Sequence, residues 1–274
     1  MTAPGPDEAV ISFNAVRIGF DEGEVLRGLS FEVLPRETLV LLGESGTGKT
    51  LSLKLAAGLL HPDGGSIRVL RNPVSEMSER DLLHFRRQIG FVFQEGALFD
   101  SLTVAENVAY RLHEDGLAEE EIEPQVREVL RFVELEHTLD QLPSELSGGM
   151  RRRVSIARAL VNHPPVVLYD SPTAGLDPVT SQTIITLILR LRDVYGVTSI
   201  LATHRLQDGF ALANFQFDPQ AGRVLHANGH GAAGSTHSCA LTRFLVLREG
   251  LVYFQGSPEE IARSSDPYLR RFLV

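Results

Sequence analysis

Eight consecutive residues constrain the fold and the chemistry of this chain more than any other segment. They read Gly43-Glu44-Ser45-Gly46-Thr47-Gly48-Lys49-Thr50, after an apolar run at Thr38–Leu42 and at the start of a helical pattern. This is the pattern of a phosphate-binding loop, in which glycines let backbone N–H groups face phosphate oxygens and the helix N-terminus adds a positive dipole end. We expect Lys49 to reach the β- and γ-phosphates and Thr50 to place its hydroxyl on Mg²⁺. The alternative is a glycine-rich turn that binds nothing.

Short apolar runs alternate with helical patterns along the chain, except between about residues 97 and 159, where the pattern is helical throughout. Short apolar runs are typical of strands buried on both faces of a sheet. This order predicts an α/β domain interrupted by a helical subdomain. The predicted strands are Val10–Phe13, Phe31–Leu34, Thr38–Leu42, Ser66–Leu70, Gly90–Phe93, Val166–Tyr169, Thr198–Ala202, Arg243–Leu247 and Leu251–Phe254. The predicted helices are Lys49–Leu59, Thr103–Leu112, Glu119–Val133, Gly148–Leu160 and Pro178–Tyr195.

Charge and cysteine content exclude several classes of function. The formal net charge is −9, which argues against nucleic acid as a partner, because phosphate backbones require clustered lysine and arginine. Cys239 is the only cysteine, so no disulfide can form within the chain and a reducing compartment is expected. The N-terminus has neither the basic start nor the apolar core of a signal peptide. The longest apolar stretch, Ile184–Leu201, is interrupted by charges, so we expect no membrane-spanning segment.

A second glycine motif narrows the interpretation. Leu146-Ser147-Gly148-Gly149-Met150 precedes a basic helical segment, and the next apolar run, Val166–Tyr169, ends at Asp170. In this order the segments closely resemble the signature region of ABC ATPases. The resemblance covers about residues 10–273. It implies a P-loop NTPase core over about residues 8–95 and 160–274, an N-terminal antiparallel β-subdomain, and an inserted helical subdomain over about residues 96–159.

The resemblance implies that two subunits face head to tail around ATP. Each ATP would lie between the phosphate loop of one subunit and Ser147, Gly148 and Gly149 of the other, at a helix start that forms a second anion site. The partner subunit would be a second copy of this chain or a related chain. The alternative for Ser147 is a helix N-cap without a ligand.

Five further positions match the family one by one. Phe20 resembles the aromatic residue that stacks on adenine, the alternative being an ordinary core phenylalanine. Gln94 resembles the glutamine that joins the two subdomains and contacts Mg²⁺ and the attacking water. Asp170 resembles the acid that holds Mg²⁺ through water, and Asp177 lies in the loop expected to cross the dimer interface. His204 resembles the histidine that contacts the γ-phosphate.

Two segments point to a subfamily. Residues 94–108, which include Gln94–Val104 and Glu106-Asn107-Val108, resemble the lipid-transporting Mla-type ATPases, and so does the tail Ser265–Leu273. The resemblance implies an integral membrane permease and an MCE-domain lipid-binding protein as partners. It places the chain at the cytoplasmic face of the inner membrane, held there by the permease.

Two other functions compete with transport. A non-transport ABC ATPase acting on DNA or ribosomes usually carries long coiled-coil insertions, zinc modules or two fused ATPase units, and the sequence contains none of these. A non-catalytic, ATP-sensing regulatory subunit is the second alternative. It is favoured by one departure from the family pattern, at the position that normally supplies the catalytic glutamate.

That departure is Ser171, which directly follows Asp170 where the family has glutamate. A hydroxyl cannot polarise the attacking water at neutral pH, whereas a positioned base contributes a rate factor of about 10²–10⁴. We therefore expect tight ATP binding with slow or altered hydrolysis. Three mechanisms are compatible with this sequence. Gln94 and His204 position the water for a slow reaction, the subunit pairs with a hydrolysis-competent relative, or another carboxylate such as Glu95 substitutes.

The second departure is an insert over about residues 215–240, which we expect to be a flexible loop because its segment Ala227–Ser238 is rich in glycine, alanine, serine and histidine. It contains His226, His230, His237 and Cys239, which are metal-ligand types, but their spacing fits no compact metal template. A regulatory or partner-binding flap and a tolerated surface insertion are the other interpretations.

Overall fold

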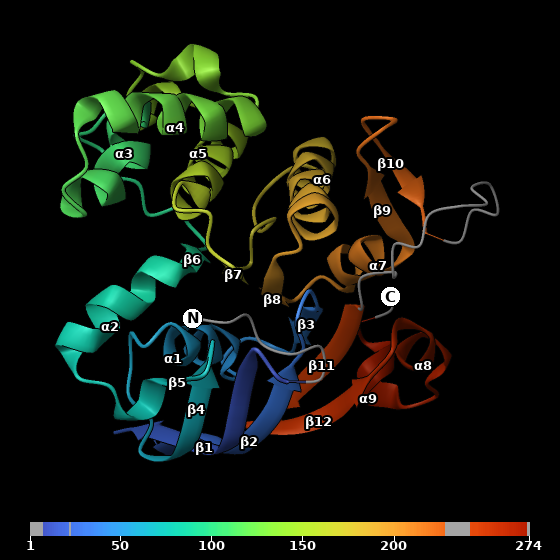
Figure 1. Cartoon of the computed structure of the whole chain (residues 1–274). Coiled ribbons are helices and arrows are strands. Elements are labelled where there is room, and N and C mark those ends of the chain that lie inside the picture. The colour runs from blue at the N-terminus through green and yellow to red at the C-terminus, as the bar shows by residue number, and fades with distance from the viewer. Residues whose placement is uncertain (1–7, 22, 228–241, 273–274) are drawn as a thin grey trace.

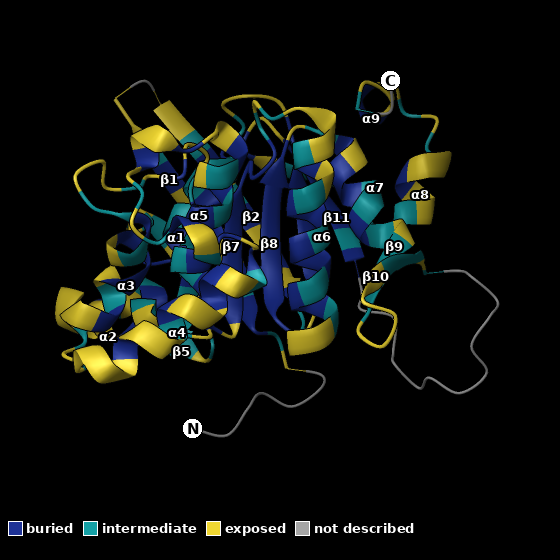
Figure 2. Cartoon of the chain, turned by 90° about the horizontal axis from the view of Figure 1, so that it is seen from above, coloured by how far each residue is buried: buried dark blue, intermediate teal, exposed yellow. Residues whose placement is uncertain are grey.

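The computed structural model describes residues 8–21, 23–227 and 242–272. Its central sheet has six strands in the order β12-β11-β3-β8-β7-β6, all parallel except the pair β11–β12 (Figure 1). Every residue of β3, β7 and β8 is buried, and β7 and β8 appear in dark blue at the centre of Figure 2. The strands are β3 (Thr38–Leu42), β6 (Ile89–Val92), β7 (Val166–Asp170), β8 (Thr198–Thr203), β11 (Thr242–Arg248) and β12 (Leu251–Gly256).

A second sheet of four antiparallel strands, in the order β2-β1-β4-β5, confirms the predicted N-terminal β-subdomain. The strands β1 and β2 are longer than the sequence pattern predicts. They pair along their whole length, with register shifts near Val16 at which the apolar alternation is interrupted. The four strands are β1 (Ile11–Phe20), β2 (Gly23–Val33), β4 (Gly64–Val69) and β5 (Asn72–Pro73).

Alternating side chains of the buried strands divide the core in two. Val40 and Leu42 pack with the helices on one face of the central sheet, and Leu39 and Leu41 pack with the antiparallel sheet on the other. The first face carries a group of three helices that projects at one end of the molecule (Figure 1). They are α3 (Val104–Glu114), α4 (Glu119–Phe132) and α5 (Gly148–Leu160), and they lie within the predicted helical subdomain.

The remaining helices lie between strands of the core, except for α8 and α9, which follow the last described strand, β12. They are α1 (Lys49–Ala56), α2 (Glu79–Phe85), α6 (Pro178–Tyr195), α7 (Leu206–Asn214), α8 (Pro258–Arg263) and α9 (Pro267–Arg270), with 3-10 turns at Val74–Glu76, Arg86–Gln88, Glu136–Thr138 and Pro143–Glu145. The helix α1 ends before the predicted Leu59, because Gly58 adopts a φ of +64° and its N–H bonds to Leu55 O at 3.0 Å. Among the described residues, no helix combines the length and apolar character that a membrane span requires.

The prediction of a flexible loop over residues 215–240 is wrong for its first half. The strands β9 (Phe215–Asp218) and β10 (Arg223–His226) form an antiparallel hairpin. Two charged residues of α6 hold it: Arg192 Nη2 donates to Phe215 O at 2.8 Å, and Asp193 Oδ2 accepts from Phe217 N at 2.7 Å. Sequence composition could not reveal these long-range contacts. The predicted ligand types His230, His237 and Cys239 lie outside the described residues.

A fully buried amide fixes the segment that follows β6. The side chain of Asn107, in α3, accepts from Phe99 N at 2.8 Å and donates to the carbonyls of Phe99 and Leu102 at 3.0 and 2.9 Å. We expect Asn107→Leu to lower the free energy of unfolding by about 2–4 kcal/mol, because these backbone groups would stay buried without partners. Urea unfolding of the nucleotide-free protein measures the loss. The control is Asn14→Leu on the exposed surface of β1, and an equal effect of both changes would contradict the expectation.

Candidate functional site

The predicted phosphate loop spans residues 43–48, between the end of β3 and the start of α1. Gly48 is the N-cap of α1, with a φ of +98° and no side-chain cap bond, so the first N–H groups of the helix face the loop. A Cβ at Gly48 would lie 2.4 Å from Leu26 Cδ2, and one at Gly43 would lie 2.8 Å from Leu247 O. The close approach of neighbouring strands therefore requires glycine at both ends of the loop.

Lys49 folds back over this loop. Its Nζ donates to the carbonyls of Gly43 and Glu44, both at 2.7 Å. Burial lowers the pKa of Lys49, and the nearby carboxylates of Asp170 and Glu44 oppose that shift. The loop thus holds a partly buried ammonium beside free N–H groups, which is an arrangement suited to phosphate.

The second element of the site is a hydroxyl and a carboxylate. Thr50 Oγ1 donates to Asp170 Oδ1 at 3.0 Å, and Asp170 is the last residue of β7, only 5% exposed. A threonine hydroxyl and an aspartate carboxylate are hard oxygen donors of the kind that Mg²⁺ binds. Burial raises the pKa of Asp170, while the Thr50 hydrogen bond and the charge of Lys49 act in the opposite direction. The donor set fits the predicted Mg²⁺ site at Thr50 and Asp170.

The raised pKa of Asp170 gives a stability prediction. The folded state holds the proton of this carboxyl more tightly than the unfolded chain, so ionised Asp170 destabilises the nucleotide-free fold above its ordinary pKa of 3.8. We expect Asp170→Asn to melt at a higher temperature than the native protein at neutral pH. The difference should shrink as the pH falls toward that pKa. Thermal unfolding over a pH series measures it, and a lower melting temperature of Asp170→Asn at neutral pH would contradict it.

The glycine motif forms the open start of α5. Ser147 is the N-cap, and its Oγ accepts from Met150 N at 3.2 Å, so within one chain it is a helix cap. Ser147 and Gly148 are exposed, whereas Gly149 is buried against α6, where a Cβ would lie 2.3 Å from Thr180 Cγ2. Among the described residues, no hydrogen bond or ion pair joins this motif to the phosphate loop. The helix start is therefore accessible to a second molecule.

Asp177 also caps a helix. Its Oδ1 accepts from Val179 N and Thr180 N at 3.0 Å, at the start of α6. These bonds and the Thr180 hydroxyl lower the pKa of Asp177. The side chain is thus committed to shaping the exposed turn that contains Gly175, which was predicted to cross the dimer interface.

The structure brings the predicted catalytic residues to one edge of the sheet. Gln94 follows β6, Ser171 follows β7 and His204 follows β8, and these strands run parallel to β3 in the order β3-β8-β7-β6. Gln94 and His204 are exposed, whereas Ser171 is 8% exposed and donates its N–H to Ala202 O at 2.8 Å. The carboxyl ends of four parallel strands thus place these residues at the same edge of the sheet as the phosphate loop.

Phe20 stands apart from these residues, at the end of β1. Its side chain is 58% exposed, which excludes the alternative of a buried core phenylalanine. It lines a cavity of about 450 Å³ with Gly23, Glu24 and Val25. An exposed aromatic face beside a cavity suits stacking of a flat ring.

Two sets of supporting residues were missed by sequence reasoning. Asp208 in α7 is 4% exposed, and its Oδ2 accepts from Thr173 Oγ1 at 2.5 Å and from Thr203 Oγ1 at 3.2 Å. It therefore ties the segment after Ser171 to the segment that carries His204. An acid in the first turn of the helix after His204 was the only available signal, because the partners are distant in sequence.

Arginines of α5 fix the segment around Gln94. Arg152 donates to Phe93 O at 2.8 Å, and Arg158 donates to Gly96 O and Ala97 O at 3.0 and 2.7 Å. The basic helix that follows Ser147 is thus connected to the start of segment 94–108, which resembles the Mla-type ATPases. Its positive charge, prominent in the sequence, is used for carbonyl contacts.

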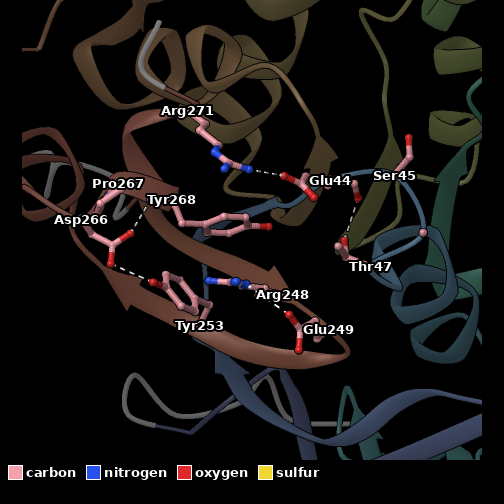
Figure 3. Close-up of a pocket in the computed structure, with 11 residues that line it drawn as sticks. Glu44, Ser45, Thr47, Arg248, Glu249, Tyr253, Asp266, Pro267, Tyr268 and Arg271 are labelled. Atoms are coloured by element: carbon pink, nitrogen blue, oxygen red, sulfur yellow. Dashed lines mark hydrogen bonds and ion pairs between the residues drawn. The ribbon is translucent and has the colours of Figure 1, made fainter.

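A polar cavity of about 520 Å³ lies between the outer side of the phosphate loop and the C-terminal segment (Figure 3). Arg271 Nη1 lies 3.6 Å from Glu44 Oε1. The guanidinium of Arg248 lies over the rings of Tyr253 and Tyr268, at 5.2 and 4.7 Å from their centroids. The tail that resembles the Mla-type ATPases therefore packs directly beside the loop.

Comparison with known proteins gives consistent results. The family described as ABC transporter matches residues 26–174. The chain is 35% identical to the chloroplastic protein TRIGALACTOSYLDIACYLGLYCEROL 3 of Arabidopsis thaliana, over 97% of this chain and 73% of the relative. It is 41% identical to the Nod factor export ATP-binding protein I of Burkholderia thailandensis (93% and 73%). It is 36% identical to the lipoprotein-releasing system ATP-binding protein LolD of Bacteroides thetaiotaomicron (71% and 90%).

Solved structures agree. The ATP-binding cassette MJ0796, in a dimeric post-hydrolysis state with ADP and Pi, superposes with a TM-score of 0.73 at 28% identity, over 90% of this chain and 98% of that one. CbiO1 of Clostridium perfringens, part of the ABC transporter complex CbiONQ, has a TM-score of 0.76 at 26% identity, with coverage of 97% and 93%. Other relatives are longer: the chain spans 51% of the methionine import ATP-binding protein MetN 1 of Acinetobacter baylyi.

Proposed function

Because this chain belongs to the ABC transporter ATPase family, we propose that it binds Mg-ATP between two head-to-tail subunits and drives a separate membrane permease for phospholipid. The observation that carries the nucleotide site is the cluster of Lys49, Thr50 and Asp170 at the carboxyl ends of the buried strands β3 and β7, which run parallel on either side of β8. The exposed helix start at Ser147 supplies the second half of the site.

Each part of the site has a defined task. Lys49 and the N–H groups of residues 43–48 bind the β- and γ-phosphates, and Phe20 stacks on the adenine. Mg²⁺, held by Thr50, Asp170 and Gln94, neutralises phosphate charge when it is bound. Ser147, Gly148 and Gly149 of the partner subunit bind the γ-phosphate from the opposite side, by helix N–H groups and the serine hydroxyl.

This arrangement makes closure of the dimer depend on ATP. Both subunits contact the γ-phosphate, which ADP lacks, so ATP favours the closed state over the open one. Gln94 and His204 position the attacking water. Ser171 cannot accept its proton, because a neutral hydroxyl is not a base near pH 7, so hydrolysis in this chain is slow. Slow hydrolysis prolongs the closed state.

Phospholipid is the proposed cargo. Two of the relatives have lipid-related names. One name contains the word trigalactosyldiacylglycerol, and the other describes a lipoprotein-releasing system. Residues 94–108 and the tail beside the phosphate loop resemble the Mla-type ATPases. These observations support a permease paired with an MCE-domain lipid-binding protein, with this chain at the cytoplasmic face of the inner membrane.

Purification of the tagged chain from membranes of its own host in mild detergent tests the proposal. Mass spectrometry should identify a permease and an MCE-domain protein, and the reconstituted complex should move fluorescent phospholipid between vesicles only with ATP. The matched control is the same complex with Lys49→Ala, which should assemble and not transport. If a permease co-purifies but the complex moves no phospholipid, only the proposed cargo is wrong. If nucleic acid co-purifies in place of a permease, the proposed role in transport is wrong.

One observation favours a second function, an ATP-sensing subunit without turnover. Ser171 removes the family's general base while the phosphate and Mg²⁺ groups remain. Absence of any ATP turnover in the complete complex would favour this role.

A further inference from the structure

A second cavity lies at the opposite edge of the sheet from the phosphate loop. Its volume is about 490 Å³, and it forms where the ends of α4, α5 and α6 meet the residues just before β7 and β8. The phosphate loop follows the carboxyl end of β3, and β3, β8 and β7 are parallel neighbours. Strands of five or six residues are about 17–20 Å long, so the two sites are separate.

Flat and branched apolar groups form most of its wall. The ring of Phe132, at the end of α4, meets that of Tyr195, at the end of α6, edge to face at 5.8 Å. Pro164, Pro165, Val197 and His163 also line the cavity. A cavity of this size with an apolar wall is typical of small-molecule sites, which fall at about 300–1,000 Å³.

One cation in the wall makes only aromatic contacts in the part of the chain that the structure describes. The guanidinium of Arg190 lies 4.5 Å from the ring centroid of Phe132 and 5.5 Å from that of Phe217, in the hairpin. Within the ranges that the structure describes, it makes no ion pair and no hydrogen bond. The two rings fix its position by cation–π contact, so its N–H donors remain available to an anion.

The other charges of the wall limit the ligand. Arg131 is already paired in a bidentate contact with Glu136, with both N–O distances at 2.9 Å. Glu128 adds a carboxylate to the same wall. A single available cation beside a carboxylate favours one negative charge and opposes polyanions such as nucleotides.

We propose that this cavity binds a small organic monoanion with a flat apolar body, its charged group on Arg190 and its body against Phe132, Tyr195 and Pro165. The site goes beyond the nucleotide chemistry and does not depend on it. Because α4 belongs to the projecting helical group and α6 to the core, the ligand contacts both parts of the chain.

Fluorescence titration tests the site with two probes of matched shape. The first is 1-anilinonaphthalene-8-sulfonate, a flat monoanion, and the second is N-phenyl-1-naphthylamine, which lacks the sulfonate. The native protein should bind one equivalent of the anion. Arg190→Gln should lower the affinity for the anionic probe about tenfold and change the affinity for the neutral probe less than twofold, because only the charge contact is lost. The matched control is Arg131→Gln, whose charge is already used by Glu136.

Two further variants test whether the probes bind in this cavity and nowhere else on the chain. Tyr195→Ala should lower the affinity for both probes, and Lys49→Ala at the phosphate loop should lower the affinity for neither. Decanoate should displace the bound anion less well than 2-naphthoate, since the wall is flat. The proposal is overturned if the native protein binds no anion, if Arg190→Gln affects both probes equally, or if Arg131→Gln is as damaging as Arg190→Gln. If decanoate displaced the bound anion better than 2-naphthoate, the proposal that the ligand has a flat body would be wrong.

Discussion

Replacing Ser171 with glutamate should raise the single-turnover rate of ATP hydrolysis by a factor of about 10²–10⁴. The position directly follows Asp170 at the end of β7, and its N–H is fixed to Ala202 O. Its φ of +47° is unfavourable for serine and glutamate alike, so the change adds no new backbone strain. A glutamate there supplies the base that the neutral hydroxyl cannot, beside Gln94 and His204.

The control for this change is Ser171→Gln, which has the size of glutamate without its basicity. ATP affinity should be similar in both variants, so that only the rate of the chemical step differs. Glu95→Gln in the native background tests whether another carboxylate already acts as base, and we expect it to leave the slow rate unchanged. Equal single-turnover rates for Ser171→Glu and Ser171→Gln would contradict the missing-base interpretation.

Lys49→Ala should weaken Mg-ATP binding by about 100-fold or more. Charge-assisted hydrogen bonds contribute about 1.5–3 kcal/mol each, and Lys49 is placed to reach two phosphates. Removal of the Lys49 ammonium also takes away a positive charge that stabilises the ionised carboxylate of Asp170. Isothermal titration with a non-hydrolysable ATP analogue and Mg²⁺ measures the loss.

The chain offers a matched control for this experiment, because Lys49 and Lys54 are its only two lysines. Both lie in α1, but Lys54 is one turn farther from the loop. We expect Lys54→Ala to change the affinity less than threefold. If Lys49→Ala bound the nucleotide as tightly as Lys54→Ala, the phosphate loop would not be the binding site.

The sequence predicted what local chemistry determines. The strand, glycine turn and helix around Lys49 form a continuous unit, and their geometry follows from glycine at positions where a Cβ would strike Leu26 or Leu247. The helix cap at Ser147 is equally local. These features need no knowledge of distant contacts.

Features that depend on long-range contacts were not predictable. The hairpin at Phe215–His226 is held by Arg192 and Asp193 of α6, and no local pattern in its sequence points to these partners. The buried carboxylate of Asp208 joins Thr173 to Thr203 across two strands. The exposure of the Phe20 side chain could be recognised only once the positions of the ends of β1 and β2 were known. Sequence patterns report periodicity within an element and leave such partners undetermined.

The central claim is that the two halves of one ATP site come from different subunits, and mixing two damaged chains tests it most directly. Lys49→Ala lacks one half of the site and Ser147→Arg lacks the other. Sedimentation in the presence of Mg-ATP measures dimer formation. We predict that the native chain dimerises and that neither variant dimerises alone. The mixture of the two variants should form dimers that contain one intact ATP site. A mixture that stays monomeric while the native chain dimerises, or a Ser147→Arg chain that dimerises unaided, would contradict the claim.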